Sequence, residues 1–141
     1  ALVFLHGSGG SGENMQAELD YVDQGEWLEL LAKNRVAMRF PTSRVQPYTI
    51  AGGRRMTIWY DRKGLAPSAP EVTATVEASV KDIKKVLDEL KGDGIPAKRI
   101  VLGGFSMGGN IAVQVALRYP ESVGAAFALS SYLCEKAAIY E

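Results

Sequence analysis

Ser106 has the sequence surroundings of a catalytic nucleophile. It lies in the pentapeptide GFSMG at residues 104–108, which matches the pattern G-x-S-x-G. An apolar run precedes this motif and a helical pattern follows it at once, so the serine falls on a sharp strand-to-helix turn. Such a turn strains the serine and projects its hydroxyl above the sheet, and glycines two positions to either side prevent a collision. The motif predicts a nucleophile at Ser106, and an incidental serine on a tightly packed turn is the alternative.

A glycine-rich loop, GSGGSG at residues 7–12, follows the apolar run at residues 2–5. Its spacing satisfies G-x-G-x-x-G, which is typical of a dinucleotide site. That site also needs an acidic residue about 20 positions further on, at the end of the next strand. The next predicted strand ends at Phe40, before Pro41 and Thr42, and offers no carboxylate. A dinucleotide-binding oxidoreductase therefore stays a minor alternative.

The same loop is suited to stabilising an oxyanion. In α/β-hydrolases one N–H of the oxyanion hole follows the nucleophile, and the other comes from the loop after an early strand. We therefore assign the two donors to the backbone N–H groups of Ser8 and Met107. His6 is the one histidine of the chain and immediately precedes the loop. We expect it to brace the loop by hydrogen bonds rather than to act as a general base.

The elements that must position these residues alternate between strands and helices, as in a parallel sheet covered by helices. We predict strands at 2–5, 36–40, 99–106 and 124–129, and a hairpin over 48–60 that turns at Gly52-Gly53. We predict helices within 13–34, over 70–91, from 107 to a stop at Pro120, and in a tail from Glu135. This order predicts one domain of the α/β class, with a mostly parallel sheet and helices on both faces.

Two of these helices carry predictions about burial. In the helix over 70–91, Pro70 suits the first helical position, and apolar residues recur at steps of three or four. They are Val72, Val76, Val80, Ile83, Leu87 and Leu90. In the first helical segment we expect the core-facing end to consist of Trp27, Leu28, Leu30 and Leu31.

The composition excludes several classes of protein. Sixteen Lys and Arg balance sixteen Asp and Glu, whereas a nucleic-acid binder normally has a basic excess. No apolar run reaches the roughly 18 residues that a membrane span needs, so we expect no stable membrane insertion. Cys134 is the single cysteine and cannot form an internal disulfide, which favours a cytoplasmic location. We predict neither a metal nor a cofactor.

Four motifs together resemble the phospholipase/carboxylesterase family of α/β-hydrolases, which includes the acyl-protein thioesterases. They are FLHGSGGSG at residues 4–12, IWYD at 58–61, GGFSMGG at 103–109 and FALSSYL at 127–133. The resemblance spans essentially the whole chain and implies an α/β-hydrolase fold.

The resemblance also implies an activity, which is hydrolysis of an acyl ester or thioester through an acyl-enzyme on Ser106. The substrates that it implies are acylated proteins, above all palmitoylated ones, and small-molecule acyl esters, including lysophospholipids. Trp59 matches the segment of the family that lies beside the acyl site, so the resemblance implies that Trp59 lines an acyl pocket. An aromatic residue at the end of a strand fits packing equally well.

The chain departs from the family pattern after the nucleophile. In this fold the catalytic acid and then the histidine follow the serine. No Asp and no His follow Ser106, and the acids that remain are Glu121, Glu135 and Glu141. We therefore expect a domain truncated at both ends, with the strand at 124–129 an unpaired edge that exposes apolar side chains. A non-catalytic binding protein that kept the fold and lost the triad is the alternative.

We predict that this chain by itself shows no esterase turnover above background, whereas the full-length protein hydrolyses the ester. A serine hydroxyl without a base is a weak nucleophile, and loss of the triad histidine has lowered turnover by about 10⁶ in a comparable enzyme. The measurement is hydrolysis of a p-nitrophenyl ester by both polypeptides. Turnover by the chain alone that Ser106→Ala abolishes would contradict the prediction.

Overall fold

The sheet at the centre of the protein is parallel and has four strands. The computed structural model describes residues 1–22 and 24–140. The strands follow the order β2-β1-β5-β6. Their bounds are β1 Leu2–Leu5, β2 Met38–Arg39, β5 Val101–Phe105 and β6 Ala125–Leu129. All three strand pairs are parallel. All four residues of β1 are buried, as expected for an apolar strand covered on both faces.

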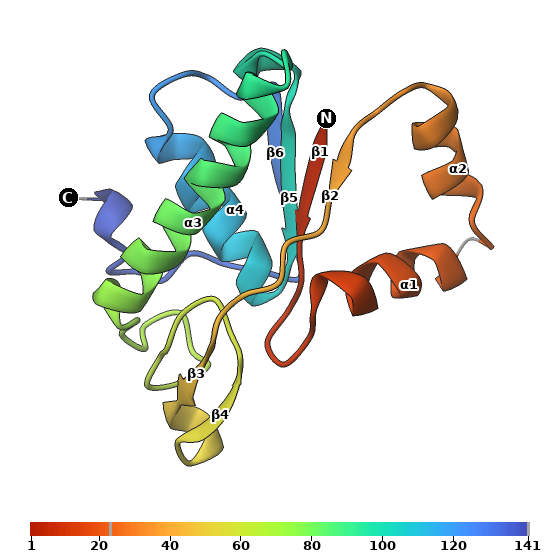
Figure 1. The fold of residues 1–141 in the computed structure, drawn as a ribbon. Helices are drawn as coiled ribbons and strands as arrows, with labels where there is room; N and C mark the ends of the chain where they lie inside the picture. Colours follow the sequence, from red (N-terminus) through yellow and green to blue (C-terminus); the bar gives the residue numbers. More distant parts are fainter. Residues whose placement is uncertain (23, 141) are drawn as a thin grey trace.

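Helices cover both faces of this sheet. α3 (Thr73–Gly92) and α4 (Met107–Arg118) lie on one side, and α1 (Gly12–Val22) and α2 (Glu26–Lys33) lie on the other (Figure 1). The structure therefore confirms the α/β class and the mostly parallel sheet with helices on both faces. Asp23 and Glu141, which fall in two of the predicted helical segments, lie outside the described residues.

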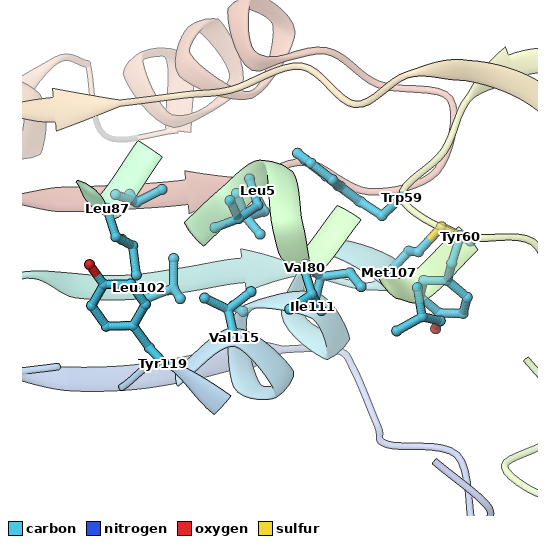
Figure 2. Packing of buried hydrophobic residues seen from close by; sticks show 14 of the residues in the cluster. Leu5, Trp59, Tyr60, Val80, Leu87, Leu102, Met107, Ile111, Val115 and Tyr119 are labelled. Carbon is cyan, nitrogen blue, oxygen red and sulfur yellow. The ribbon is translucent and has the colours of Figure 1, made fainter. Parts of the chain in front are cut away.

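The main core fills the space between the sheet and the pair α3 and α4. The predicted apolar stripe of α3 is buried from its second member onward: Val76, Val80, Ile83, Leu87 and Leu90. Burying each such side chain contributes roughly 1.5–3 kcal/mol. This exceeds the loss of about 0.5 kcal/mol for a β-branched residue in a helix, so packing determines where α3 forms. Figure 2 shows Leu102 and Tyr119 at one end of the cluster and Trp59 and Met107 at the other.

α3 begins three residues later than predicted, and Pro70 is not its first residue. Residues 70–72 are extended because they pair with the segment after Tyr60. The N–H of Val72 donates to the carbonyl of Asp61 at 2.8 Å, and the N–H of Lys63 donates to the carbonyl of Pro70 at 3.2 Å. Val72 is then the N-cap of the helix. A tertiary backbone pairing thus overrides the local preference of proline for a first helical turn.

Two predictions for the N-terminal half were wrong in detail. Leu28 of α2 is buried, but Leu30 is 57% exposed rather than core-facing. Residues two apart on a helix point in different directions, so both cannot face the same neighbour. The strand predicted at 36–40 is reduced to Met38–Arg39, which pairs only with Leu2 and Val3 of β1.

The predicted hairpin is present, with its strands displaced toward the N-terminus. β3 (Val45–Tyr48) pairs with β4 (Arg54–Thr57) in an antiparallel register, and the short helix η1 (Thr49–Ala51) lies between them. Gly52 and Gly53 complete the turn with positive φ angles of 66° and 78°. The hairpin lies below the carboxyl ends of the parallel strands in Figure 1.

The C-terminal part has less regular structure than predicted. The chain forms a short helix η2 (Ala97–Arg99) before β5. The helical tail expected from Glu135 is limited to the single turn η3 (Ala138–Tyr140). The segment before η3 is bound to a distant part of the chain, because the N–H of Glu135 donates to the carbonyl of Pro67 at 2.9 Å.

β6 is an edge strand with exposed apolar side chains, as predicted. Within residues 1–22 and 24–140 it pairs with β5 and with no other strand. Four of its five residues are exposed, including Leu129 at 47%. Phe127 is half-buried because its ring meets that of Phe4 edge-on, with 5.5 Å between the ring centroids.

The approach of α4 to β1 gives the first structural prediction. A Cβ atom at Gly108 would lie 2.4 Å from the carbonyl oxygen of Leu5 and 2.6 Å from that of His6. These are backbone atoms of β1 and of the residue that follows it, so the clash can be relieved only if α4 moves away from the sheet. We expect Gly108→Ala to lower the free energy of unfolding by about 3 kcal/mol. Urea unfolding monitored by circular dichroism measures this free energy.

Gly92→Ala is the matched control, because nothing lies within 4 Å of a Cβ atom at Gly92. We expect this change to leave the stability unaltered or to raise it by up to about 1 kcal/mol. Equal losses in the two variants would show that close packing is not what requires glycine at position 108.

Candidate active site

Ser106 occupies the turn that joins β5 to α4 and has a conformation that L-residues rarely adopt. Its φ is 52° and its ψ is −120°. A Cβ atom at Gly104 would lie 2.3 Å from the carbonyl carbon of Gly108, so the glycines two positions before and after the serine almost touch. This is the sharp, glycine-flanked turn that the motif predicts. A non-glycine residue with such angles stores strain of order 1–3 kcal/mol.

Neighbouring backbone holds the strained residue in place. The N–H of Ser106 donates to the carbonyl of Leu129 at 2.8 Å, and its carbonyl accepts from the N–H of Gly109 at 3.0 Å. A Cβ atom at Gly109 would lie 2.7 Å from the Cβ atom of Ser131. The end of β6 and the segment after it therefore fix the turn from one side. Ser106 itself is only partly buried, so a substrate can reach its side chain.

The glycine loop lies against the other side of the turn. A Cβ atom at Gly7 would lie 3.6 Å from the Cβ atom of Ser106 and 3.0 Å from Cδ1 of Phe105. The loop is tied to the hairpin, because the N–H of Gly9 donates to the carbonyl of Thr57 at 2.7 Å. These contacts bring the first loop of the chain within reach of the serine at position 106.

Two backbone donors near the serine are without a protein acceptor. Among residues 1–22 and 24–140, the N–H groups of Ser8 and Met107 make no hydrogen bond. The Met107 N–H belongs to the first residue of α4, where intrahelical acceptors are absent. Its side chain is 1% exposed and lies in the core, so only the backbone of Met107 faces the site. Unpaired backbone donors near a serine suit an anion, and the assignment of these two groups to an oxyanion hole stays a prediction.

His6 braces the glycine loop, as expected from the sequence. Its Nδ1 atom lies 2.6 Å from the carbonyl oxygen of Gly7, and its Nε2 atom accepts the N–H of Ser43 at 3.0 Å. This pair of contacts selects the neutral ring with its proton on Nδ1. Burial lowers the pKa of His6, and the ring is 1% exposed, so the neutral form is favoured. Both nitrogens are occupied, and neither is free to serve Ser106.

Trp59 contacts both the backbone and the ring of His6. Its indole Nε1 donates to the carbonyl of His6 at 2.8 Å, and the two rings lie 5.0 Å apart. The side chain is 2% exposed and belongs to the main core, with Tyr60 and Met107 close by (Figure 2). Contact between Trp59 and an acyl chain stays a prediction, and this burial does not favour it.

The sequence reasoning missed a buried polar cluster around Arg62. Arg62 donates from Nε to the hydroxyl of Tyr48 at 2.9 Å and from Nη1 to that of Tyr132 at 3.2 Å. Burial is the main cause that raises the pKa of Cys134 to about 11, and the nearby carboxylate of Glu71 adds to the shift. This thiol therefore stays protonated and inert. The sequence has no pattern that would have placed Arg62 in the interior, because it stands in a charged Asp-Arg-Lys stretch.

Other chemistry is limited in the part of the chain that the structure describes. No group of three or more His, Cys, Asp or Glu side chains there could hold a metal ion. No helix among these residues has the length and apolar character to cross a bilayer. Of the acids that follow Ser106, Glu121 forms an ion pair with Lys91 at the surface.

This arrangement, a serine on the turn between a parallel strand and a helix with a glycine loop beside it, is that of the α/β-hydrolase fold. A profile of the Phospholipase/Carboxylesterase family matches residues 1–141. The chain belongs to this family.

Two curated proteins and one solved structure illustrate the similarity. Lysophospholipase-like protein 1 of Mus musculus is 31% identical over the whole chain. Acyl-protein thioesterase 1 homolog 1 of Dictyostelium discoideum is 32% identical over 94% of the chain. The chain spans 57% of the length of each of these relatives. The crystal structure of SOBER1 from Arabidopsis thaliana matches 94% of the chain with a TM-score of 0.79 and 26% identity, and the match covers 61% of that structure.

The strain at Ser106 predicts different effects on stability of two substitutions that both remove the hydroxyl. Ser106→Gly releases the positive φ, so we expect it to raise the free energy of unfolding by about 1–2 kcal/mol. Ser106→Ala keeps the strain, and we expect a stability within about 0.5 kcal/mol of the unaltered protein. Thermal unfolding of the two variants measures the difference. Equal melting temperatures would show that the turn is not strained.

Proposed function

We propose that the protein is a serine hydrolase that cleaves acyl esters or thioesters through an acyl-enzyme on Ser106. The observation that carries the proposal is the strained, accessible serine, which precedes the unpaired N–H of Met107 and lies against the glycine loop that carries the unpaired N–H of Ser8. The family and the names of the relatives favour acylated proteins or small-molecule acyl esters as substrates, and our proposal includes palmitoylated proteins among the former. The single cysteine of the chain, Cys134, is free of a disulfide, which supports a reducing compartment such as the cytoplasm.

The proposed reaction has two halves. The hydroxyl oxygen of Ser106 attacks the acyl carbon and gives up its proton to a base, and a tetrahedral oxyanion forms. This oxyanion accepts hydrogen bonds from the N–H groups of Ser8 and Met107. The bond to the alcohol or thiol then breaks, the leaving group takes a proton, and Ser106 retains the acyl group. Water attacks the acyl-enzyme in the same way and releases the free acid.

The position of Met107 at the start of α4 strengthens its role in the proposal. The twelve-residue helix directs the positive end of its dipole toward the site, where it stabilises negative charge. A backbone donor anchored by a buried side chain also needs little reorganisation when the oxyanion forms. Donors placed in advance in this way contribute more than mobile side chains of the same chemistry.

The base of the reaction is assigned outside residues 1–141. His6 is the one histidine in the chain, and its two nitrogens hold Gly7 and Ser43. The chain spans 57% of its curated relatives, so the proposal takes the general base and its acid partner from a segment that this chain does not include.

A non-catalytic binding protein with the same fold is the second candidate, since no histidine follows Ser106. Labelling of the complete natural polypeptide with a fluorophosphonate separates the two candidates, because only an activated serine reacts quickly. We expect rapid labelling that Ser106→Ala abolishes. An intact, folded protein that resists the reagent would support the binding protein instead.

The oxyanion assignment gives a prediction for Ser8, whose backbone N–H, and not its side chain, is the proposed donor. Ser8→Pro deletes the N–H donor, so we expect kcat for an acyl ester to fall about 10²–10³-fold. Ser8→Ala keeps the donor and removes only an exposed hydroxyl, so we expect kcat within about threefold of the unaltered enzyme. Both variants are compared in the complete natural polypeptide, with melting temperature as the check on folding. Equal activities in two folded variants would remove Ser8 from the assignment.

A further inference from the structure

A groove of about 370 Å³ lies between the glycine loop and α1. Its floor is the segment from His6 to Ser11, its outer wall is formed by Asn14, Met15 and Glu18 of α1, and Phe105 borders it next to Ser106. The groove therefore includes Ser8, the proposed oxyanion donor, and Phe105, the residue before the proposed nucleophile, together with one side of α1. Figure 1 shows α1 running outward from this loop.

The lining of the groove suits a polar group rather than a long alkyl chain. Ser8, Ser11, Asn14 and Glu18 contribute hydroxyl, amide and carboxylate groups, and their side chains lie toward solvent or only partly buried. Packing hydrocarbon against a carboxylate would strip water from the charge without replacing its hydrogen bonds. The part of a substrate that fits this groove is therefore the leaving group and not the acyl chain.

Two features of the lining attract a cation. Glu18 is the one residue in the groove that carries a formal charge, and among the described residues it takes part in no ion pair. Helix α1 also carries Glu13 and Asp20 and has no Lys or Arg. Phe105, which also lines the groove, is 43% exposed, and the face of an aromatic ring attracts an ammonium group.

No positive side chain of the groove opposes this attraction. His6 is the one basic residue in the lining, and its burial favours the neutral ring. Glu18 and Phe105 both line the groove, and a carboxylate together with an aromatic ring is a combination that recognises ammonium groups. An anionic leaving group would meet Glu18 with no cation to offset the repulsion.

We propose that the groove between the glycine loop and α1 receives the leaving group of the substrate and favours one that carries a positive charge. Glu18 is the residue that sets this preference. The inference rests on the proposed function and adds to it the chemical class of the leaving group.

The test compares two thioesters of equal shape in the complete natural polypeptide. Butyrylthiocholine has a trimethylammonium leaving group, and S-(3,3-dimethylbutyl) thiobutyrate replaces its nitrogen by carbon. We expect kcat/KM to favour the cationic substrate by about tenfold at low ionic strength, with a smaller ratio in high salt. Glu18→Gln should reduce this ratio to near one. Glu13→Gln, on the same helix but outside the groove, is the matched control and should keep it.

Each outcome bears on a different claim. If the unaltered protein hydrolyses neither thioester and resists the fluorophosphonate, the proposed function fails and the inference fails with it. If it hydrolyses both at similar rates, or if the ratio survives Glu18→Gln, the inference alone is overturned. Equal loss of the ratio in Glu13→Gln and Glu18→Gln would assign the preference to the overall charge of α1, which also contradicts a specific role for the groove.

Discussion

The close approach of backbone to backbone around Ser106 is the constraint on which the rest of the site depends. Gly104 and Gly108 almost touch, and Gly108 in turn lies against the carbonyls of β1. Side chains at these positions would separate the sheet from α4, and the serine would lose its unusual angles. The same contacts that bury the core therefore also keep the hydroxyl of Ser106 out of it. The stability of the fold and the exposure of this hydroxyl thus depend on the same backbone contacts.

A second layer of polar contacts sets the position of the glycine loop. His6 connects the loop to Ser43, and Trp59 connects the backbone of His6 to the segment after the hairpin. Because these groups are buried, each of their hydrogen bonds would leave an unsatisfied partner if it broke, at a cost of about 1–3 kcal/mol. Residues far apart in the chain are thereby coupled to the loop that faces Ser106. The one histidine of the chain thus serves the site through geometry rather than through proton transfer.

Much of this arrangement could be predicted from the sequence, because it depends on local patterns. The apolar stripe of α3, the parallel strands and the turn at Ser106 all follow from the spacing of apolar residues and glycines. The errors come from contacts between distant segments. The start of α3 is moved past Pro70 by pairing with residues 61–63, and the burial of Arg62 depends on Tyr48 and Tyr132. A short stretch of sequence does not show which distant residues these segments contact.

The outer edge of β6 has a consequence for which segments can extend the sheet. Its five residues, AAFAL, contain no charge and no proline, and the described residues provide no strand to pair with that edge. Backbone groups exposed in this way act as a template for any extended segment of another molecule, and side chains of this kind do nothing to repel it. Among residues 1–22 and 24–140, the strand next to the proposed nucleophile therefore keeps a row of backbone groups with which a further extended segment can pair.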